Sequence, residues 1–429
     1  MTVVAIVDTG VNLQHVDFQN KLWVNPFEIA GNGVDDDNNG VVDDIHGYDA
    51  ITGQAISRVG DPEGHGTHVA GIVTTTSPGA EIMGVRLLNA SGGGSLSDAI
   101  DAWSYALLHG AQVINNSWGA LGVKPSDVEF LEEVIAIGEE DFDAVFIAAA
   151  GNESTNTDRV PNTPSTAPGM LSVGASNSKG NPANFSNFGQ RTVDLFAPGV
   201  NILSADAFST TGKLRLSGTS MASPVVAGAA ATLLDRQPLA SPATIKQQIL
   251  DNVVPRIKLS SLSLTGGVLS NEFTAPFTKS LRQNKAMNTT SQNFIDQDLS
   301  PAATATATFK KASAGKKNFK KIICVLDQPD QDSKMDIWNE LMAEPYTKKV
   351  AWPEAFGDRI CVLTVRKGHR GKSDRKDAIR SMRASGHFWS VNWDRKIGIT
   401  TTSTDSYSDD FGSSTATIPT ITEPNFSLI

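Results

Sequence analysis

The sequence predicts an α/β fold, in which a parallel β-sheet carries helices on both faces and is followed by a small α+β domain. Short apolar runs alternate with longer helical patterns over residues 1–277, as in sheets whose parallel strands are connected by helices. Residues 278–318 are rich in Thr, Ala, Ser, Asn, Gln and Lys, and we expect a flexible linker there. Structured patterns return over residues 319–399, before a Ser- and Thr-rich tail at 400–429 that we expect to be disordered.

Six strands and five helices are expected in the first region. The strands are short apolar runs, at Val3–Val7, Ile82–Leu88, Val113–Asn116, Val145–Ala149, Leu171–Ala175 and Val193–Ala197. The helices are expected at His65–Thr74, Leu96–His109, Pro125–Glu140, Ser220–Arg236 and Ser241–Asn252. This order predicts the parallel sheet.

The second region shows a βαββαβ order, which is the signature of a ferredoxin-like domain. Its strands are expected at Lys320–Asp327, Thr347–Trp352, Arg359–Val365 and Phe388–Trp393. Its helices are expected at Ser333–Ala343 and Asp374–Ser385. Alternating apolar residues in the first and last strands indicate that these strands are half-buried.

Composition and charge exclude several classes of protein. The chain has 429 residues, of which 40% are hydrophobic and 19% charged, as in globular proteins. No apolar run approaches the ~18 residues of a membrane span, and we expect no nucleic-acid partner. Residues 1–277 carry 13 Lys and Arg against 29 Asp and Glu, whereas residues 310–396 carry 20 against 11. The two regions are therefore oppositely charged and could attract each other.

Two cysteines, Cys324 and Cys361, lie in the basic C-terminal region. Residues 1–277 therefore hold no disulfide. An extracellular protein without disulfides needs another staple, often a bound metal ion, whereas an intracellular one needs none, so the cysteine count does not fix the compartment. The chain enters a strand directly after Met1, without a signal peptide. We expect that the natural chain starts upstream.

Asp8 ends the first expected strand, in the sequence Val-Asp-Thr-Gly. The carboxyl ends of parallel strands are where open α/β sheets place their active sites. Taken alone, this motif also fits an aspartic protease, a metal site or a turn with a solvated Asp. Asp8 is thus a candidate active-site residue, and its role depends on which other reactive residues the chain carries.

His65 opens the motif His-Gly-Thr-His-Val-Ala-Gly at the start of an expected helix. An imidazole there could act as the base for a nucleophile. His68 could suggest a metal pair, but no acidic base or third histidine stands at metalloprotease spacing. We therefore expect His65 to be a catalytic base and His68 a structural residue.

Ser220 lies in Ser217-Gly-Thr-Ser-Met-Ala-Ser-Pro, where a turn leads into a helix of small residues. At a helix start, a hydroxyl and backbone N–H groups face the same point, which favours negative charge developing there. An isolated Ser in this position would more often be a helix cap. The Asp and His motifs make the nucleophile the better interpretation.

The three motifs together resemble the subtilisin-like serine proteases, the subtilases (peptidase family S8), over about residues 1–275. The resemblance implies a serine-type endopeptidase with Asp8, His65 and Ser220 as a catalytic triad, and Asn152 as a side-chain donor to the oxyanion. An α/β-hydrolase would show a Gly-x-Ser-x-Gly turn and a different chain order. The alternative is a catalytically inactive homologue that acts as a binding protein, although all four residues are present.

The resemblance also implies where a polypeptide substrate binds in extended conformation, between two backbone edges and beside a specificity pocket. The edges are Gly92, Gly93 and Gly94, and Ser117, Trp118 and Gly119. The pocket is expected to contain Ala150 and Gly151, with Asn162 at its floor.

An acidic segment after residue 31 predicts a structural Ca²⁺ site. Oxygen ligands at alternate positions, a glycine for the turn and a carbonyl resemble the opening of a calcium loop. The expected ligands are Asp35, Asp37, Asn39 and the carbonyl of Val41, with Asp43 or Asp44 closing the shell because the usual Glu is absent. A solvated acidic turn is the alternative. Similar acidic insertions in some subtilases bind calcium.

Two further expectations rest on family analogy. The family implies an extracellular or secretory location. The βαββαβ region is similar in element order to the inhibitory pro-domains of subtilases, although those precede the catalytic domain. Two interpretations follow. Either residues 319–399 inhibit the enzyme intramolecularly, with the segment Arg395–Ile399 lying across the substrate site, or they form an appended domain that binds another acidic partner or spaces the chain.

Overall fold

The protein was analysed as a computed structural model. It describes residues 1–57, 60–122 and 125–270, followed by the segments 321–326, 347–351, 360–365, 388–393 and 396–399. The expected linker and tail lie outside these residues. Within the described part, no helix is long and apolar enough to cross a membrane.

The centre of the molecule is a sheet of ten described strands in the order β14-β15-β11-β10-β8-β6-β1-β4-β2-β3. Neighbours from β15 to β2 run parallel, while β14 and β3 are antiparallel strands at the two edges. The strands are β1 Val3–Asp8, β2 Gly47–Asp49, β3 Gln54–Ala55, β4 Glu81–Arg86, β6 Val113–Asn116, β8 Val145–Ala149, β10 Leu171–Ser176, β11 Leu195–Pro198, β14 Val253–Pro255 and β15 Gly267–Leu269.

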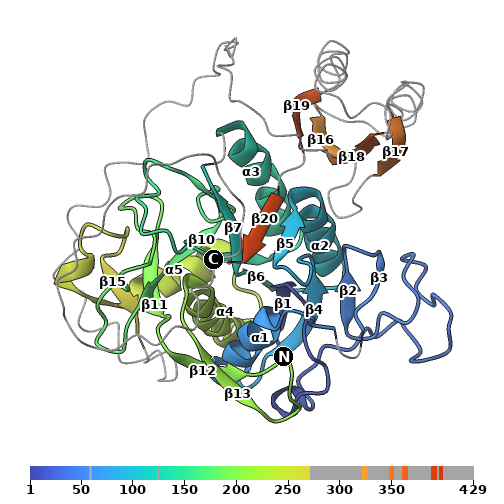
Figure 1. Cartoon of the computed structure of the whole chain (residues 1–429), viewed down its shortest axis with the longest axis horizontal. Coiled ribbons are helices and arrows are strands. Elements are labelled where there is room, and N and C mark those ends of the chain that lie inside the picture. The colour runs from blue at the N-terminus through green and yellow to red at the C-terminus, as the bar shows by residue number, and fades with distance from the viewer. Residues whose placement is uncertain are drawn as a thin grey trace.

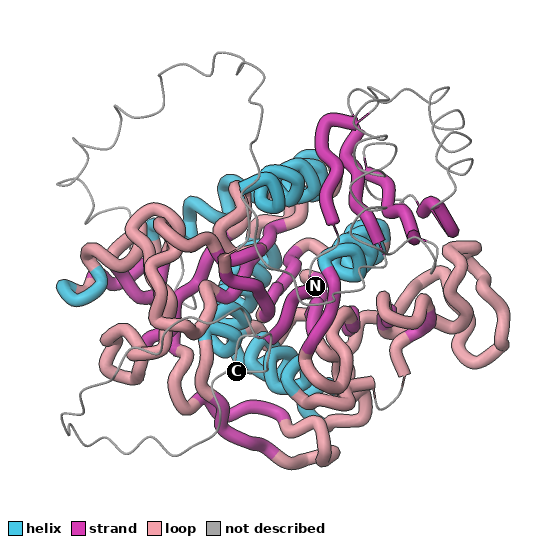
Figure 2. The backbone as a smooth tube through the Cα atoms, turned by 45° about the horizontal axis from the view of Figure 1, so that its top comes forward, coloured by secondary structure: helices cyan, strands magenta, loops and turns pink. Residues whose placement is uncertain are grey.

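Helices cover both faces of this sheet (Figure 2). On one face, α2 (Leu96–Leu108) and α3 (Pro125–Glu140) form an apolar core with Ala5 and Val7 of β1. On the other, α1 (His65–Thr76), α4 (Thr219–Arg236) and α5 (Pro242–Asp251) pack with Val4 and Ile6. Adjacent residues of β1 thus enter different cores, because side chains alternate along a strand.

The strands and helices expected in residues 1–277 are present, with small shifts at their ends. The largest change in a strand start is at β11, which begins at Leu195 rather than Val193. The Val193 N–H donates to the carbonyl of Gly189, so that this residue belongs to the preceding turn. The parallel α/β sheet is therefore confirmed.

Several short elements escaped prediction because they lack a long apolar pattern. They include the hairpin of β12 (Ile202–Ala205) and β13 (Lys213–Leu216) and two 3₁₀ turns, Val16–Phe18 and Ile257–Leu259. A separate sheet has the order β5-β20-β7-β9. Its strands are β5 Gly93–Ser95, β7 Trp118–Leu121, β9 Asn162–Thr163 and β20 Lys396–Ile399.

Four C-terminal strands form a further antiparallel sheet in the order β17-β18-β16-β19 (Figure 1). They are β16 Lys321–Leu326, β17 Thr347–Ala351, β18 Ile360–Val365 and β19 Phe388–Trp393. All four match predicted strands, and Cys324 lies opposite Cys361 in the register of β16 and β18. The two predicted helices lie outside the described residues, so the ferredoxin-like assignment stays a prediction.

Candidate active site and acidic loop

The predicted base and its carboxylate partner meet at the C-terminal end of β1. Asp8 lies on the same face of the strand as Val4 and Ile6, which is the face covered by α1 and α4. His65 is the first residue of α1, and its Nδ1 lies 2.7 Å from Asp8 Oδ1. Both side chains are buried. A carboxylate on Nδ1 holds the ring so that Nε2 can accept a proton.

A glycine allows α1 to begin this close to β1. A Cβ atom on Gly66 would lie 2.2 Å from the carbonyl oxygen of Gly10 and 3.0 Å from Asp8 Cβ. Such a contact would force the backbone apart, so a larger residue at this position would move His65 away from its partner.

Asp61, which is not among the predicted site residues, braces the same junction. Its Oδ1 accepts hydrogen bonds from the Thr9 hydroxyl and the Gly64 N–H, both at 2.7 Å. Its Oδ2 accepts from the Thr67 hydroxyl at 2.6 Å. Burial raises the pKa of Asp61, although these donors oppose the rise. The sequence feature that could have indicated Asp61 is its position four residues before His65.

The surroundings of His65 favour its protonated form. Burial alone would lower the pKa of His65, but the charge and hydrogen bond of Asp8 and the charges of Glu63 and Asp61 raise it above the ordinary value. Glu63 also accepts the backbone N–H of His65 at 2.9 Å. At acidic pH, more of the imidazole is therefore protonated and unable to take a proton.

Ser220 is buried in the first turn of α4, as predicted. Its hydroxyl donates to the carbonyl of Ser117 at 3.0 Å. The start of a helix leaves backbone N–H groups unpaired within the helix and carries the positive end of the helix dipole. This position therefore favours an anion that forms beside the hydroxyl.

Asn152 follows β8 and lies next to the start of α4. Its Oδ1 accepts hydrogen bonds from the N–H and the hydroxyl of Thr219, at 2.9 and 3.0 Å. These two donors fix the orientation of the amide, so Nδ2 is the side that remains available to bind another group.

Three buried nitrogens of the site have no hydrogen-bond partner among the described residues: Trp118 Nε1 at the substrate edge, and His65 Nε2 and Asn152 Nδ2 beside Ser220. Buried polar groups are nearly always paired because leaving one unpaired costs about 1–3 kcal/mol. The last two belong to residues whose other polar atoms are firmly held. The pattern indicates atoms kept ready for a bound molecule or a reacting group.

The predicted peptide-binding edges become short strands. Gly93 and Gly94 lie in β5, and Gly92 is in the turn just before it with a φ of 66°. Trp118 and Gly119 begin β7, directly after Ser117, and β7 pairs with β9.

The predicted pocket residues also come together. The carbonyl of Ala150 accepts hydrogen bonds from Asn162 Nδ2 at 3.0 Å and from Asn187 Nδ2 at 2.9 Å. A Cβ on Gly151, whose φ is 101°, would lie 2.3 Å from Asn187 Nδ2. Burial raises the pKa of Glu153, which accepts from Asn187 at 2.6 Å. Asn187 was not predicted as part of this site.

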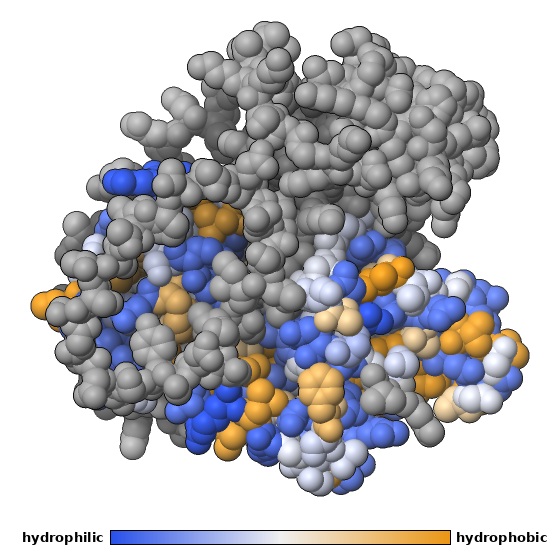
Figure 3. All heavy atoms as spheres, in the orientation of Figure 1, coloured by the Kyte–Doolittle hydropathy of each residue, from blue (hydrophilic) through white to orange (hydrophobic). Residues whose placement is uncertain are grey.

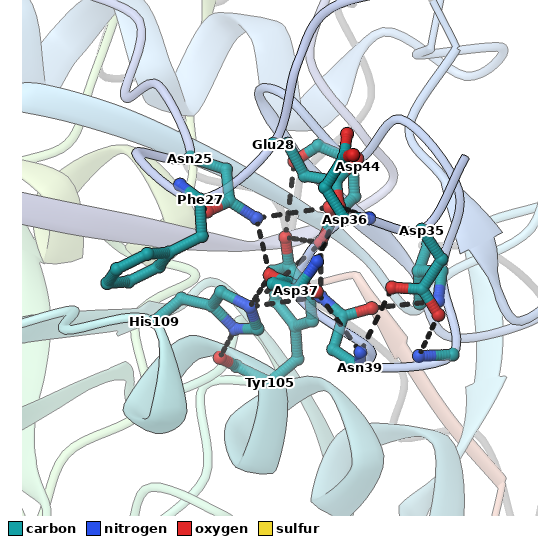
Figure 4. A network of polar contacts seen from close by, with 12 residues as sticks. Asn25, Phe27, Glu28, Asp35, Asp36, Asp37, Asn39, Asp44, Tyr105 and His109 are labelled. Atoms are coloured by element: carbon teal, nitrogen blue, oxygen red, sulfur yellow. Dashed lines mark hydrogen bonds and ion pairs between the residues drawn. The ribbon is translucent and has the colours of Figure 1, made fainter. Parts of the chain in front are cut away.

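The acidic segment forms a projecting loop whose carboxylates point toward one another (Figures 1 and 4). Glu28, Asp35 and Asp37 each offer an oxygen, and these atoms lie within 4.8 Å of one another. Asp37, Asp44 and His109 form a second such group. The two groups share Asp37, so the loop concentrates negative charge around one residue.

The interior of the loop is tied to α2. Asp44 is fully buried, and the Tyr105 hydroxyl donates to it at 2.6 Å. Asn39 Nδ2 donates to Asp44 at 2.9 Å and to Asp37 at 3.1 Å. Burial opposes ionisation of Asp37, but hydrogen bonds from Asn25 and Asn39 and the nearby His109 hold its pKa below the usual value.

One predicted ligand, Asp43, points elsewhere. The carboxylate of Asp43 accepts from the N–H groups of Gly31 and Gly33, at 2.7 and 3.1 Å, and is not part of either group. The Val41 N–H donates to Asn39 Oδ1 at 2.7 Å.

Two members of these carboxylate groups, Glu28 and His109, were not among the metal ligands predicted from the sequence. Glu28 precedes the acidic run and could have been suspected from its neighbourhood. His109 follows α2 and reaches the loop only through the fold, so no local pattern indicated it. The same loop exposes apolar side chains, including Phe27 and Ile29. In Figure 3, apolar atoms gather at the right of the face shown, where Figure 1 places this loop.

Comparisons with known proteins find subtilases and other serine proteinases. The model of the Subtilase family, Peptidase_S8, matches residues 1–294. The extracellular serine proteinase of Thermus sp. (strain Rt41A) is 33% identical over 258 residues, which cover 59% of this chain and 55% of that protein. Subtilisin DY of Bacillus licheniformis is 29% identical over 256 residues, covering 57% of this chain and 81% of that protein.

Other relatives extend the range. The putative subtilase-type proteinase isp6 of Schizosaccharomyces pombe is 33% identical over 266 residues, which cover 59% of this chain and 50% of that protein. The chain thus spans about half the length of several relatives that it matches. A crystal structure of a cold adapted subtilisin-like serine proteinase superposes with a TM-score of 0.51 and 28% identity, covering 63% of this chain and 88% of the other. With the family model matching most of the sequence, the chain belongs to the subtilase family.

Proposed function

We propose that this chain is a serine endopeptidase in which Asp8, His65 and Ser220 form the catalytic triad. The observation that supports this most is the pair of buried unpartnered nitrogens, His65 Nε2 and Asn152 Nδ2, on residues that are otherwise held in place. One is suited to accept a proton and the other to donate to an oxyanion.

The reaction follows from these roles. Ser220 Oγ attacks the carbonyl carbon of the scissile bond while His65 Nε2 takes the hydroxyl proton, and Asp8 stabilises the resulting imidazolium. The tetrahedral oxyanion receives hydrogen bonds from Asn152 Nδ2 and the N–H of Ser220. His65 then gives its proton to the leaving amine, and water hydrolyses the acyl-enzyme through the same base.

The substrate is a polypeptide in extended conformation between β5 and β7. Their short backbone edges, built largely from glycine and small residues, can pair with an added strand. The residue before the scissile bond would enter the region of Ala150, Gly151 and Asn162. Its polar lining favours polar side chains there.

A calcium ion in the acidic loop would stabilise the enzyme. The oxygen donors fit this ion, since Glu28, Asp35 and Asp37 bring three carboxylates within a few ångström, and Ca²⁺ prefers oxygen ligands. When bound, the ion would neutralise their mutual repulsion and hold the loop against α2. Asp44 and Asn39 are placed beside this group.

An extracellular or secretory location also belongs to this proposal. It rests on a relative that is named an extracellular serine proteinase. No observation favours the inactive alternative, because the triad residues and Asn152 are all present.

The test is hydrolysis of a peptide library by the wild type and by Ser220→Ala. We expect the variant to lose activity by several orders of magnitude while its melting temperature stays close to that of the wild type, because one hydroxyl is removed. Ser217→Ala, three positions earlier, is the matched control. Substantial residual hydrolysis by pure Ser220→Ala would contradict the assignment.

A further inference from the structure

The chain's own segment Lys396–Ile399 lies where the substrate is proposed to bind. As β20, it runs between β5 and β7 and pairs antiparallel with both (Figure 1). Gly398 lies opposite Gly93 on one side and opposite Gly119 on the other. A strand with partners on both sides has the pairing expected of a bound peptide.

The end of β20 points to the nucleophile. Ile399 lies opposite Trp118. The residue before Trp118 is Ser117, whose carbonyl accepts the hydroxyl of Ser220 at 3.0 Å. The strand therefore ends one register step from the residue that contacts Ser220, so its direction is that of the acyl side of a substrate.

The sheet that precedes β20 holds it from the N-terminal side. β19 (Phe388–Trp393) ends shortly before Lys396 and contacts α3 of the catalytic region. β19 itself has no charged residue. Residues 310–396 as a whole are basic, whereas α3 carries acidic residues and no Lys or Arg, so opposite charges favour association of the two regions. The acidic residues of α3 are Asp127, Glu129, Glu132, Glu133, Glu139 and Glu140.

We propose that Lys396–Ile399 is a tethered inhibitor that occupies the substrate position between β5 and β7 and competes with other peptides. This inference rests on the proposed endopeptidase function. Because the tether is on the acyl side, hydrolysis beyond β20 would leave the strand attached to its sheet and in place, like a bound product.

Tethering explains how such a short strand can compete. Flexible tethers give effective concentrations of up to roughly millimolar. A strand whose own dissociation constant is about 0.1 mM would then leave about a tenth of the molecules open at any time. Releasing the strand should therefore raise kcat/KM about tenfold.

The variant Gly398→Pro tests this in the full-length protein. Proline has no N–H and a fixed φ, so it is excluded from strands with partners on both sides. We expect kcat/KM for a short fluorogenic peptide to rise about tenfold, and the isolated peptide covering residues 388–399 to inhibit the variant competitively. Gly412→Pro, beyond β20, is the matched control and should behave as the wild type. Thermal melting checks that each protein is folded.

A second variant guards against misfolding of the first. A chain that ends at Arg395 lacks β20 altogether and should be activated to the same degree. Equal kcat/KM in the wild type and both variants, with Ser220 labelled by a fluorophosphonate in all of them, would overturn the inhibitor and leave the peptidase intact. Neither hydrolysis nor labelling in any folded form would overturn the peptidase itself, and with it this inference.

Discussion

At the scale of single residues, hydrogen bonds hold one polar atom each of His65 and Asn152 and leave one side-chain nitrogen of each without a partner among the described residues. Asp8 takes one nitrogen of His65, and Thr219 takes the carbonyl of the Asn152 amide. In each case the remaining nitrogen is fixed in direction without being used. Preorganised donors of this kind stabilise a transition state more than a ground state, because they need no rearrangement when charge appears.

Glu63 gives a prediction at the same scale. Its charge raises the pKa of His65, so Glu63→Gln should lower that pKa and leave more neutral imidazole at acidic pH. The acidic limb of the kcat/KM profile should therefore move to lower pH, with little change at the optimum. A pH series on a short peptide measures this. Glu81→Gln is the control, because Glu81 begins β4 at the edge of the sheet opposite to Asp8, and it should leave the profile unchanged. An acidic limb that does not move in Glu63→Gln would contradict the role of Glu63.

At the scale of elements, the sequence motifs predicted which strand or helix end carries each residue of the proposed triad. Asp8, His65 and Ser220 were placed correctly at the end of β1 and the starts of α1 and α4 because apolar runs and small-residue motifs bound these elements. Asp61 and Asn187 were not found. Asn187 binds Ala150, which becomes its neighbour only on folding, and no local pattern records that contact. Asp61 binds Gly64 and Thr67 nearby in the sequence, but its bond to Thr9 also depends on the fold.

The acidic loop shows the same limit. Its carboxylates were predicted from their spacing, but spacing did not reveal that Asp43 binds backbone N–H groups of the loop or that His109 approaches Asp37. Ligand sets in loops depend on how the chain turns, and several residues here have positive φ, including Asn38 and Asp43.

Calcium binding provides the prediction for this element. An ion that binds only the folded state stabilises it by mass action, by about 2.7 kcal/mol when its concentration is a hundred times the dissociation constant. EDTA should therefore lower the melting temperature of the wild type, and calcium should restore it. The double variant Asp35→Ala and Asp37→Ala should lose the response. Asp36→Ala, in the same loop but outside both carboxylate groups, should keep it. A wild type indifferent to EDTA would contradict the site.

At the scale of the whole molecule, one chain joins an acidic region, residues 1–277, to a basic region, residues 310–396. Opposite charge was visible in the sequence, and so were the four strands of the second sheet. β20 connects the two regions, because it pairs with β5 and β7, which lie about three hundred positions earlier in the sequence. We infer that the chain carries both a peptidase and its regulator.

The most direct test of this account is covalent labelling of Ser220 in the Gly398→Pro variant. A fluorophosphonate reacts with a serine only when base and oxyanion donors are assembled around it. We expect peptide mapping by mass spectrometry to find the label on Ser220, faster in Gly398→Pro than in the wild type, and none in a variant that also carries Ser220→Ala. A folded Gly398→Pro protein without label on Ser220 would contradict the central claim that this chain is a serine peptidase.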